Sequence, residues 1–490
     1  MKNHLFLKQI LILGVTAFFV MGVYIIFSNQ TYRIGYPLDD AWIHQTFARN
    51  LVHYRQFAYS QGVPSAGSTA PLWTFLLSLG YLFTGNNYTW TMILGWASLV
   101  TLGWLGEGIF ARITDRYDSR IPWVGLLLML EWHFVWAAAS GMETLILADI
   151  SLGILLILLG KKIRWFVVGI LIGLGIWIRP DALMLLGPVI VILIITISQR
   201  KAGGKDAGWL ILGAILLFIP YLLFNHSISG NFWPNTFFAK QLEYQEILQL
   251  PLLTRVWTVF QQHIVGMGIL LLPGLFYRIW VSCRNKEWRL LTFVIWWAGF
   301  LLVYAMRLPV GYQHGRYEIP VMPFFLIVSG SGVYAIWRLC QNRRIPRILS
   351  TAWVLAILFV NTAFFWLGAR TYANDVAIIE SEMVDTAKWI NANTPQESVI
   401  AAHDIGALGF FGERQILDLA GLISPVVLPV IRDETGLLIL IQKSDVDYLM
   451  TFPSWYPAIT SKLTAIHISG GVFSPSNGGD NMTVYKINTK

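Results

Sequence analysis

The stretch Pro37-Leu38-Asp39-Asp40-Ala41-Trp42-Ile43 places two adjacent carboxylates shortly after the first long apolar segment of the chain. The residues that follow have helical spacing, with Ile43, Phe47 and Leu51 on one face, which predicts a helix lying at a membrane surface. A carboxylate at the start of a helix bonds free backbone N–H groups, so Asp39 is expected to cap this helix. If the acid pair stood alone, its simplest explanation would be that one residue caps the helix and the other is exposed to water. The rest of the chain decides whether the pair belongs to a site.

The composition is that of a protein with many membrane-spanning helices. Of the 490 residues, 56% are hydrophobic and 13% are charged, and the mean hydropathy is +0.58, which excludes an ordinary large soluble core. The net charge of +8 is concentrated in loops between apolar segments, as in cytoplasmic loops of membrane proteins. No interleaved basic and aromatic patch occurs, so no nucleic-acid partner is expected. The two cysteines fall near predicted cytoplasmic ends, which argues against a disulfide or a metal site built on them.

Apolar length and the Lys/Arg bias predict about eleven transmembrane helices between residues 5 and 367. Lys2 and Lys8 place the N-terminus in the cytoplasm, and the apolar run after them is long for a signal peptide and is expected to remain as an anchor. The segment 71–83 is short for a span, so we expect it to be interfacial or re-entrant. With that choice every predicted cytoplasmic loop is basic, which is typical of a multi-pass protein of a cytoplasmic (inner) membrane.

Two domains are predicted. Residues 1–369 form a transmembrane domain with long external loops at 29–89 and 225–263. Residues 370–490, hereafter the C-terminal domain, form a small extracytoplasmic α/β domain, because short buried strands alternate there with helical patterns. Its predicted helices are 374–391 and 436–444, and its predicted strands are 398–402, 416–419 and 448–451.

Charged residues at membrane depth or at the ends of spans are costly, so each is a functional candidate. Many of them share the predicted outer side. The acids are Asp39, Asp40, Glu143 and Asp181; the basic residues are Arg179, Lys240, Arg316 and His314; Asn235 and Tyr317 lie beside them in the sequence.

Each candidate also has an ordinary structural explanation. Glu143 is placed to cap the helix that follows it, and Arg179 is placed to form a local ion pair two residues further on. His314 alone is typical of a surface histidine. Lys240 and Arg316 are typical of cations that reach toward the lipid boundary. The functional interpretation therefore depends on the whole set sharing one side of the membrane.

The order of these motifs resembles the GT-C superfamily of membrane glycosyltransferases, which use polyprenyl-phosphate sugars. Members of the arabinofuranosyltransferase and mannosyltransferase types are most similar, over roughly the first two-thirds of the chain. The resemblance is carried by Leu38-Asp39-Asp40-Ala41-Trp42-Ile43, Ala70-Pro71-Leu72-Trp73, Ser140-Gly141-Met142-Glu143-Thr144, Arg179-Pro180-Asp181 and Pro234-Asn235-Thr236-Phe237-Phe238-Ala239-Lys240.

The resemblance implies roles for the candidate residues. Asp39 would be the base that takes a proton from the acceptor hydroxyl. Asp40 and Glu143 would orient that hydroxyl or hold a divalent cation, Mg²⁺ or Mn²⁺, and the candidate metal ligands are Asp39 and Glu143. The donor phosphate would be held by four basic residues, Lys240, Arg179, Arg316 and His314. Further substrate contacts would come from Asn235, Tyr317 and Asp181.

The implied activity is transfer of a sugar, with inversion, from a polyprenyl-phosphate donor to a hydroxyl of an extracytoplasmic glycan, lipid or protein. Two other classes remain open. A lipid-linked substrate transporter or flippase predicts ionisable residues near the bilayer midplane and broken helices in paired halves. A non-catalytic membrane sensor predicts that the C-terminal domain is the binding module. The clustering of charges at outer turns and the lack of a two-half repeat favour the enzyme.

Overall fold

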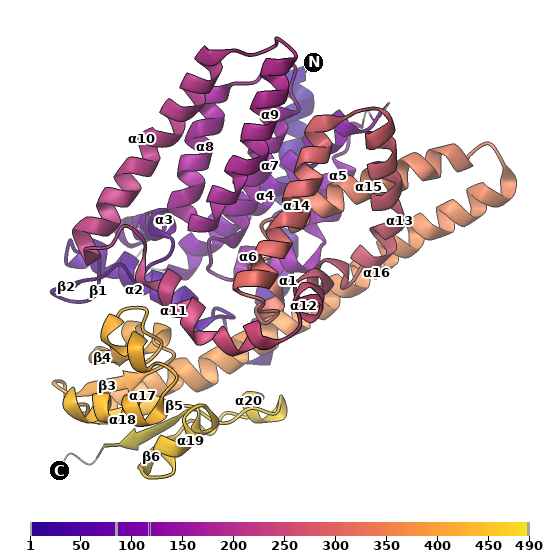
Figure 1. Ribbon diagram of the computed structural model, residues 1–490. Helices are drawn as coiled ribbons and strands as arrows, with labels where there is room; N and C mark the ends of the chain where they lie inside the picture. Colours follow the sequence, from indigo (N-terminus) through magenta and orange to yellow (C-terminus); the bar gives the residue numbers. More distant parts are fainter. Residues whose placement is uncertain (1, 84–86, 116, 118, 488–490) are drawn as a thin grey trace.

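The computed structural model shows a bundle of long helices with a smaller domain packed against one end (Figure 1). It describes residues 2–83, 87–115, 117 and 119–487. The C-terminal domain lies at the same end as the elements formed by the two long predicted external loops, and α1 begins at the opposite end (Figure 1). The predicted outer segments therefore gather on one side of the bundle.

The bundle contains most of the helices of the chain. In the first half they are α1 (Lys2–Thr31), α4 (Asn87–Ile113), α5 (Trp123–Met129), α6 (Trp132–Ala139), α7 (Thr144–Leu158), α8 (Trp165–Ile178), α9 (Leu186–Ser198) and α10 (Gly204–Ser229). In the second half they are α12 (Leu252–Ile264), α13 (Gly268–Arg284), α14 (Trp288–Arg307), α15 (Met322–Cys340) and α16 (Arg344–Ile378).

Among the described residues, seven helices are long and apolar enough to cross a membrane. The number is eight if α12 and α13, which meet at a bend of 101°, form one broken span. The chain is therefore a multi-pass helical membrane protein, as the sequence predicts. The count of eleven spans stays a prediction, because α7 and α8 have 15 and 14 residues, fewer than the roughly 20 that cross a bilayer.

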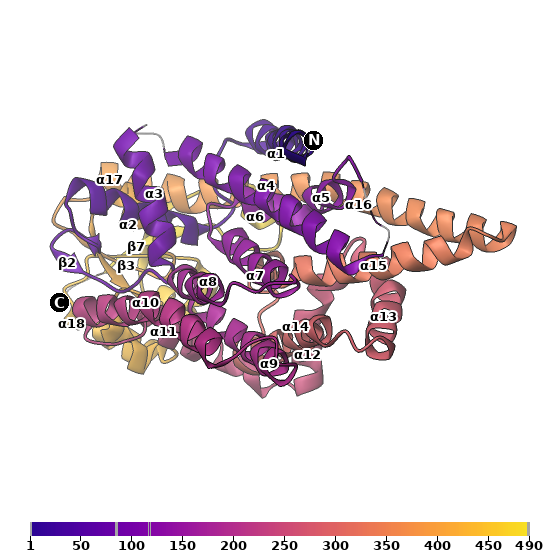
Figure 2. The same cartoon turned by 90° about the horizontal axis from the view of Figure 1, so that it is seen from above.

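Close packing in the bundle depends on glycine where α8 and α10 lie side by side (Figure 2). A Cβ atom on Gly169 would lie 2.3 Å from the carbonyl oxygen of Leu210, and one on Gly213 would lie 2.4 Å from that of Phe166. Small residues let membrane helices approach to backbone contact in this way. The outward face of α10 instead exposes large apolar side chains suited to lipid, among them Leu212, Leu216 and Leu223.

The helix predicted after the acid pair forms as α2 (Asp39–His53), but it is an internal element. Gln45, expected on the polar face, has no exposed surface, and Phe47 is equally buried. Helix α2 is covered by a short strand, by a second helix and by the C-terminal domain. The prediction that α2 exposes a polar face to water is therefore wrong, whereas its position at a membrane surface stays a prediction. The covering elements are β1 (Ala58–Ser60), which pairs with β2 (Val63–Pro64), and α3 (Pro71–Phe83).

A single continuous helix joins the bundle to the C-terminal domain. After α16 the chain makes a π-helical turn at 379–384 and continues as α17 (Asp385–Asn393), so that Arg344–Asn393 is one rod of 50 residues. The predicted helix 374–391 is the outer end of this rod. The predicted domain boundary at 369/370 falls inside it.

Two buried glutamates in the π turn attach the rod to its surroundings. Glu382 has no exposed surface and accepts the backbone N–H of Met482 at 2.8 Å. Glu380 pairs with Arg33, which follows α1, at 2.5 Å. Buried charges are normally paired or hydrogen-bonded. These contacts hold the C-terminal domain against the end of the bundle.

The C-terminal domain contains a five-stranded mixed sheet with the order β4-β3-β5-β7-β6. Strand β3 runs parallel to both its neighbours, and β7 runs antiparallel to both of its own. The predicted strands form as β3 (Val399–Ala402), β4 (Gln415–Asp418) and β5 (Tyr448–Thr451), and the predicted helix forms as α18 (Glu434–Lys443). Elements not predicted are α19 (Pro457–Thr460), β6 (Thr464–Ile468), α20 (Phe473–Ser476) and β7 (Thr483–Lys486). Strand β6 is largely exposed and so lacks the buried apolar run that marks a strand.

Candidate functional site

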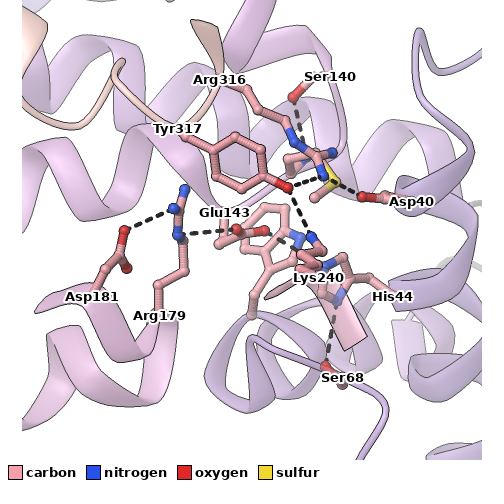
Figure 3. A network of polar contacts seen from close by, with 12 residues as sticks. Asp40, His44, Ser68, Ser140, Glu143, Arg179, Asp181, Lys240, Arg316 and Tyr317 are labelled. Carbon is pink, nitrogen blue, oxygen red and sulfur yellow. Dashed lines mark hydrogen bonds and ion pairs between the residues drawn. The ribbon is translucent and has the colours of Figure 1, made fainter. Parts of the chain in front are cut away.

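A cavity of about 450 Å³ lies where the bundle meets the C-terminal domain. Its polar lining comes from parts of the chain that are distant in sequence (Figure 3). They are α2, the loop before α3, the turn before α7, the turn after α8, helix α11 (Asn235–Glu243), the end of α14 and the segment between α14 and α15.

Asp40 is the first-loop carboxylate that faces the cavity. Its Oδ2 accepts a hydrogen bond from Nη2 of Arg316 at 2.5 Å. Burial alone would raise the pKa of Asp40, but the guanidinium of Arg316 and the ammonium of Lys240 hold it well below its usual range. Asp40 is therefore ionised at neutral pH.

Two cations meet at the phenol of Tyr317. The Tyr317 oxygen accepts hydrogen bonds from Nζ of Lys240 and from Nη2 of Arg316, both at 2.8 Å. Burial raises the pKa of Tyr317, but the two cations outweigh burial and lower the pKa of the phenol. Nη1 of Arg316 is buried without a hydrogen-bond partner in the described part of the chain. This guanidinium therefore has donors left for an anionic ligand.

Glu143 lies beside these groups, in the turn before α7, and is 4% exposed. Its Oε1 is 3.9 Å from Nε of Arg179, and its Oε2 is 3.5 Å from Nε2 of His44. Oε2 has no hydrogen-bond partner among the described residues, and the side chain makes no capping bond to α7. Helix capping therefore does not explain Glu143. Its carboxylate faces the cavity instead.

Arg179 and Asp181 form an ion pair, with 2.7 Å between Nη2 and Oδ2. From the sequence alone, this pair could have been a purely local contact. Tyr304 joins the pair, because its hydroxyl lies 2.8 Å from Nη2 of Arg179 and donates to Oδ2 of Asp181 at 2.6 Å. The residue before a proline is disfavoured in helices, and Arg179, which precedes Pro180, is extended with φ −157°. Helix α8 therefore ends here, and the guanidinium turns toward the cavity (Figure 3).

The rest of the cavity lining is largely apolar. The two kinds of surface together fit an amphiphilic ligand with an anionic group and a hydrocarbon portion. The apolar side chains include Ile43, Met142, Leu183, Met184, Trp233, Val303, Leu308 and Leu422.

Asp39, predicted to be the base, is not among the described residues that line the cavity. Its Oδ2 accepts the backbone N–H of Gly406 at 2.6 Å, and its Oδ1 accepts that of Ala407 at 2.8 Å. The start of α2 has no side-chain cap. Asp39 therefore caps the turn of helix that begins at Gly406 in the C-terminal domain, and the prediction that it caps its own helix is wrong. The reason is that its partners lie 367 and 368 residues further along the chain.

Two more predicted site residues lie away from the cavity lining. Nε2 of His314 is 2.8 Å from Oδ2 of Asp375, which belongs to α16. Asn235 is 6% exposed at the start of α11, and its neighbour Thr236 lines the cavity in its place. The other predicted basic residues, Arg179, Lys240 and Arg316, all line the cavity.

The predicted pair of metal ligands does not come together as a site. Both oxygens of Asp39 accept backbone N–H groups, whereas Glu143 lies on the cavity. Within residues 2–83, 87–115, 117 and 119–487, no group of three or more His, Cys, Asp or Glu side chains is placed to hold a metal ion. The residues present do not fit a divalent cation held by Asp39 and Glu143.

Several cavity residues escaped prediction, among them Arg307, His44 and Tyr304. His44 follows Asp40 by one helical turn, so the spacing i, i+4 could have placed both on one face of α2. Tyr304 lies within the apolar run of α14, and nothing in the surrounding sequence distinguishes it from a packing residue.

Comparison with known families and curated proteins is informative for one part of the chain. Residues 372–485 match a family model described as a domain of unknown function, DUF8728. No curated protein matches the chain.

Solved structures share the fold over most of the chain. ArnT from Cupriavidus metallidurans, bound to undecaprenyl phosphate, superposes with a TM-score of 0.58 at 12% identity, covering 96% of this chain and 97% of its own. The archaeal oligosaccharyltransferase AglB from Archaeoglobus fulgidus, in complex with an inhibitory peptide and a dolichol-phosphate, gives 0.57 at 11% identity, covering 89% and 69%. A complex of the Archaeoglobus fulgidus oligosaccharyltransferase with Zn and sulfate gives 0.57 at 11%, covering 88% and 68%. The chain therefore shares the fold of ArnT and of the archaeal oligosaccharyltransferase AglB, in agreement with the fold that the sequence resemblance implied.

Proposed function

We propose that the protein is an inverting glycosyltransferase that moves a sugar from a polyprenyl-phosphate donor to a hydroxyl group of a glycan, lipid or protein acceptor. The observation that carries the proposal is one cavity that combines an ionised carboxylate, four cations (Arg179, Lys240, Arg307 and Arg316) and an apolar wall. Undecaprenyl phosphate and dolichol-phosphate are bound in the structures of ArnT and AglB. The shared fold supports the same class of lipid as the donor here.

We assign the donor phosphate to the cations Lys240, Arg179 and Arg316. Guanidinium groups bind phosphate through two parallel N–H···O bonds, whereas an ammonium acts as a point charge. The spare nitrogen of Arg316 supports its place in this set. Asp181 and Tyr317 would hold the cations in position through the bonds described above, and the apolar wall would take the first isoprene units.

We assign the general base to Asp40 in place of Asp39. A base must be unprotonated and must reach the hydroxyl that it serves. Asp40 is ionised and faces the cavity, whereas Asp39 has both oxygens bonded to the C-terminal domain. Binding of the donor phosphate would draw Arg316 partly away from Asp40, which would leave the carboxylate free to accept a proton.

The proposed reaction is one displacement at the anomeric carbon. Asp40 takes the proton of the acceptor hydroxyl as the acceptor oxygen forms the new bond to carbon. The bond from carbon to the phosphate oxygen breaks, and the electron pair leaves with the polyprenyl phosphate, whose charge the three cations stabilise. A single displacement of this kind inverts the configuration. Glu143 and His44 line the same cavity as Asp40 and would orient the acceptor hydroxyl.

The predicted topology puts this chemistry on the outer face of a cytoplasmic membrane, with the N-terminus in the cytoplasm. We propose that residues 1–369 form the catalytic domain and that residues 370–490 cover the acceptor side. The contact between Asp39 and the C-terminal domain supports this arrangement, since it lies one residue from the proposed base.

The test is transfer from a panel of polyprenyl-phosphate sugars by the purified full-length protein in nanodiscs. Asp40→Asn keeps the shape of the side chain but removes the base, so turnover should fall about 10²–10⁴-fold. The matched control is Asp445→Asn, an exposed acid of the C-terminal domain that should leave turnover unchanged. Equal turnover in wild type and Asp40→Asn would exclude Asp40 as the base. Lipid flux into vesicles without any glycosidic product would favour the transporter.

A further inference from the structure

A second cavity, of about 520 Å³, lies at the end of the bundle opposite to the C-terminal domain. It is separate from the first cavity, because Tyr304 of α14 lines the first cavity and Trp288 of the same helix lines the second. At 1.5 Å per residue these positions are roughly 24 Å apart along the helix. In the predicted orientation the second cavity opens toward the cytoplasm.

The lining of this cavity has a large surplus of positive charge. It is formed by the end of α4, the α7–α8 loop, the end of α9 and the turn between α13 and α14. Two acids among the described lining residues, Asp115 and Glu287, face six cations: Arg112, Lys161, Lys201, Arg278, Lys286 and Arg289. Like charges gathered at a low-dielectric surface repel one another and attract anions.

The buried cation of this set is Arg278, which is 8% exposed. Its Nη2 bonds Oε2 of Glu287 at 2.6 Å. Its Nε is buried and has no hydrogen-bond partner among the residues that the structure describes. A buried donor left unpaired is costly, so an acceptor that enters the cavity would stabilise this group.

Two more arginines are fixed by carbonyl groups at the end of α7. Nη1 of Arg289 donates to the carbonyl oxygens of Leu158 and Gly160, both at 2.9 Å, and Nη1 of Arg112 donates to that of Leu156. Each guanidinium carries five N–H donors in a fixed fork, so these bonds engage only part of each group. The arginines are held in place while donors remain for a ligand.

We infer that this cavity is a binding site for a phosphate ester. A fork of N–H donors matches two phosphate oxygens, and several cations around one group suit phosphate better than a single carboxylate. The phosphate can reach the cavity as the head group of an anionic lipid or as a soluble ester. Bound there, it would link four loops of the bundle end that otherwise repel one another.

The test measures apparent affinity for two probes by the shift of the thermal unfolding midpoint of the full-length protein. The lipid probe is phosphatidylglycerol, titrated into phosphatidylcholine nanodiscs; the soluble probe is glycerol phosphate, titrated in detergent. The cavity variant is Lys161→Gln with Lys201→Gln, two exposed cations of the lining. The matched control is Arg344→Gln with Arg347→Gln, two exposed cations of another predicted cytoplasmic segment.

For at least one probe, the cavity variant should bind about 30-fold more weakly than wild type, while the control variant should retain most of the affinity. A response to glycerol phosphate identifies a site for soluble esters, and a response to phosphatidylglycerol alone identifies a lipid site. Arg278→Gln tests the buried cation. If Arg278→Gln does not fold, the cavity variant, which changes only exposed lysines, still tests the inference. The inference is overturned if neither probe shifts the midpoint, or if the cavity and control variants lose equal affinity.

Discussion

The two neighbouring acids at the start of α2 have different surroundings. Asp40 faces the main cavity and pairs with Arg316, whereas Asp39 gives both oxygens to backbone N–H groups of the C-terminal domain. The close fit leaves no space beside Asp39, since a Cβ atom on Gly406 would lie 2.8 Å from its Oδ2. Asp40 is thus placed to act on a ligand in the cavity, and Asp39 is placed to connect the bundle to the C-terminal domain.

Asp39→Asn should destabilise the protein without acting on the chemical step. An amide has one acceptor oxygen, so the N–H of Gly406 or of Ala407 would lose its partner. A buried unpaired donor costs about 1–3 kcal/mol, so the thermal unfolding midpoint should fall. Asp40→Asn should leave that midpoint closer to wild type while it lowers turnover. A wild-type midpoint for Asp39→Asn would show that the contact with the C-terminal domain contributes little.

At the scale of elements, the helices that carry the site are positioned by close packing within the bundle. Helix α8 ends at Arg179 and packs along α10, where the backbones approach at Gly169 and Gly213. Any side chain at these positions would push the two helices apart. The position of the Arg179 guanidinium therefore depends on glycines that do not contact the cavity.

Gly213→Ala should destabilise the bundle, because the added Cβ would lie 2.4 Å from the carbonyl oxygen of Phe166. Forced overpacking costs about 1–3 kcal/mol. The control is Gly208→Ala on the same helix, where a Cβ atom would meet nothing within 4 Å and alanine should stabilise the helix by up to about 1 kcal/mol. Thermal unfolding of both variants in the same detergent gives the comparison. Equal midpoints would mean that the helices adjust to the extra methyl group.

At the scale of the whole molecule, the C-terminal domain is attached to two of the elements that bring charge to the cavity, α2 and α11. Arg49 of α2 donates to the carbonyl oxygens of Phe410 and Gly409 at 2.7 and 3.2 Å. Glu243 of α11, one turn after the cavity residue Lys240, pairs with His403 at 3.3 Å. Movement of the C-terminal domain would therefore move Asp40 and Lys240 relative to the rest of the cavity lining.

Arg49→Gln should loosen this attachment. The change removes charge-assisted hydrogen bonds worth about 1.5–3 kcal/mol, so amide hydrogen exchange in residues 405–412 should become about tenfold faster or more. Arg55→Gln, an exposed arginine that follows the same helix, is the control and should leave exchange in this segment unchanged. Unchanged exchange in Arg49→Gln would mean that other contacts alone hold the segment.

The sequence by itself determined the class of the molecule. Long apolar segments with basic loops are sufficient to predict a multi-pass helical protein, because lipid admits only segments that satisfy their own backbone groups. The alternation of short strands and helices after Arg370 was sufficient to predict three of the strands in the C-terminal domain. The motifs from Asp39 to Lys240 were sufficient to predict the fold and most of the charged residues that line the cavity.

Only the tertiary structure decided which acid faces the cavity. Adjacent residues on a helix point about 100° apart, so the rotation of α2 against its neighbours selects Asp40 and not Asp39. That rotation is set by partners such as Gly406, which is hundreds of residues away and has no signal near the acid pair. The same reason applies to His314, which meets Asp375 of the long rod, and to Tyr304, which joins Arg179 from the apolar run of α14.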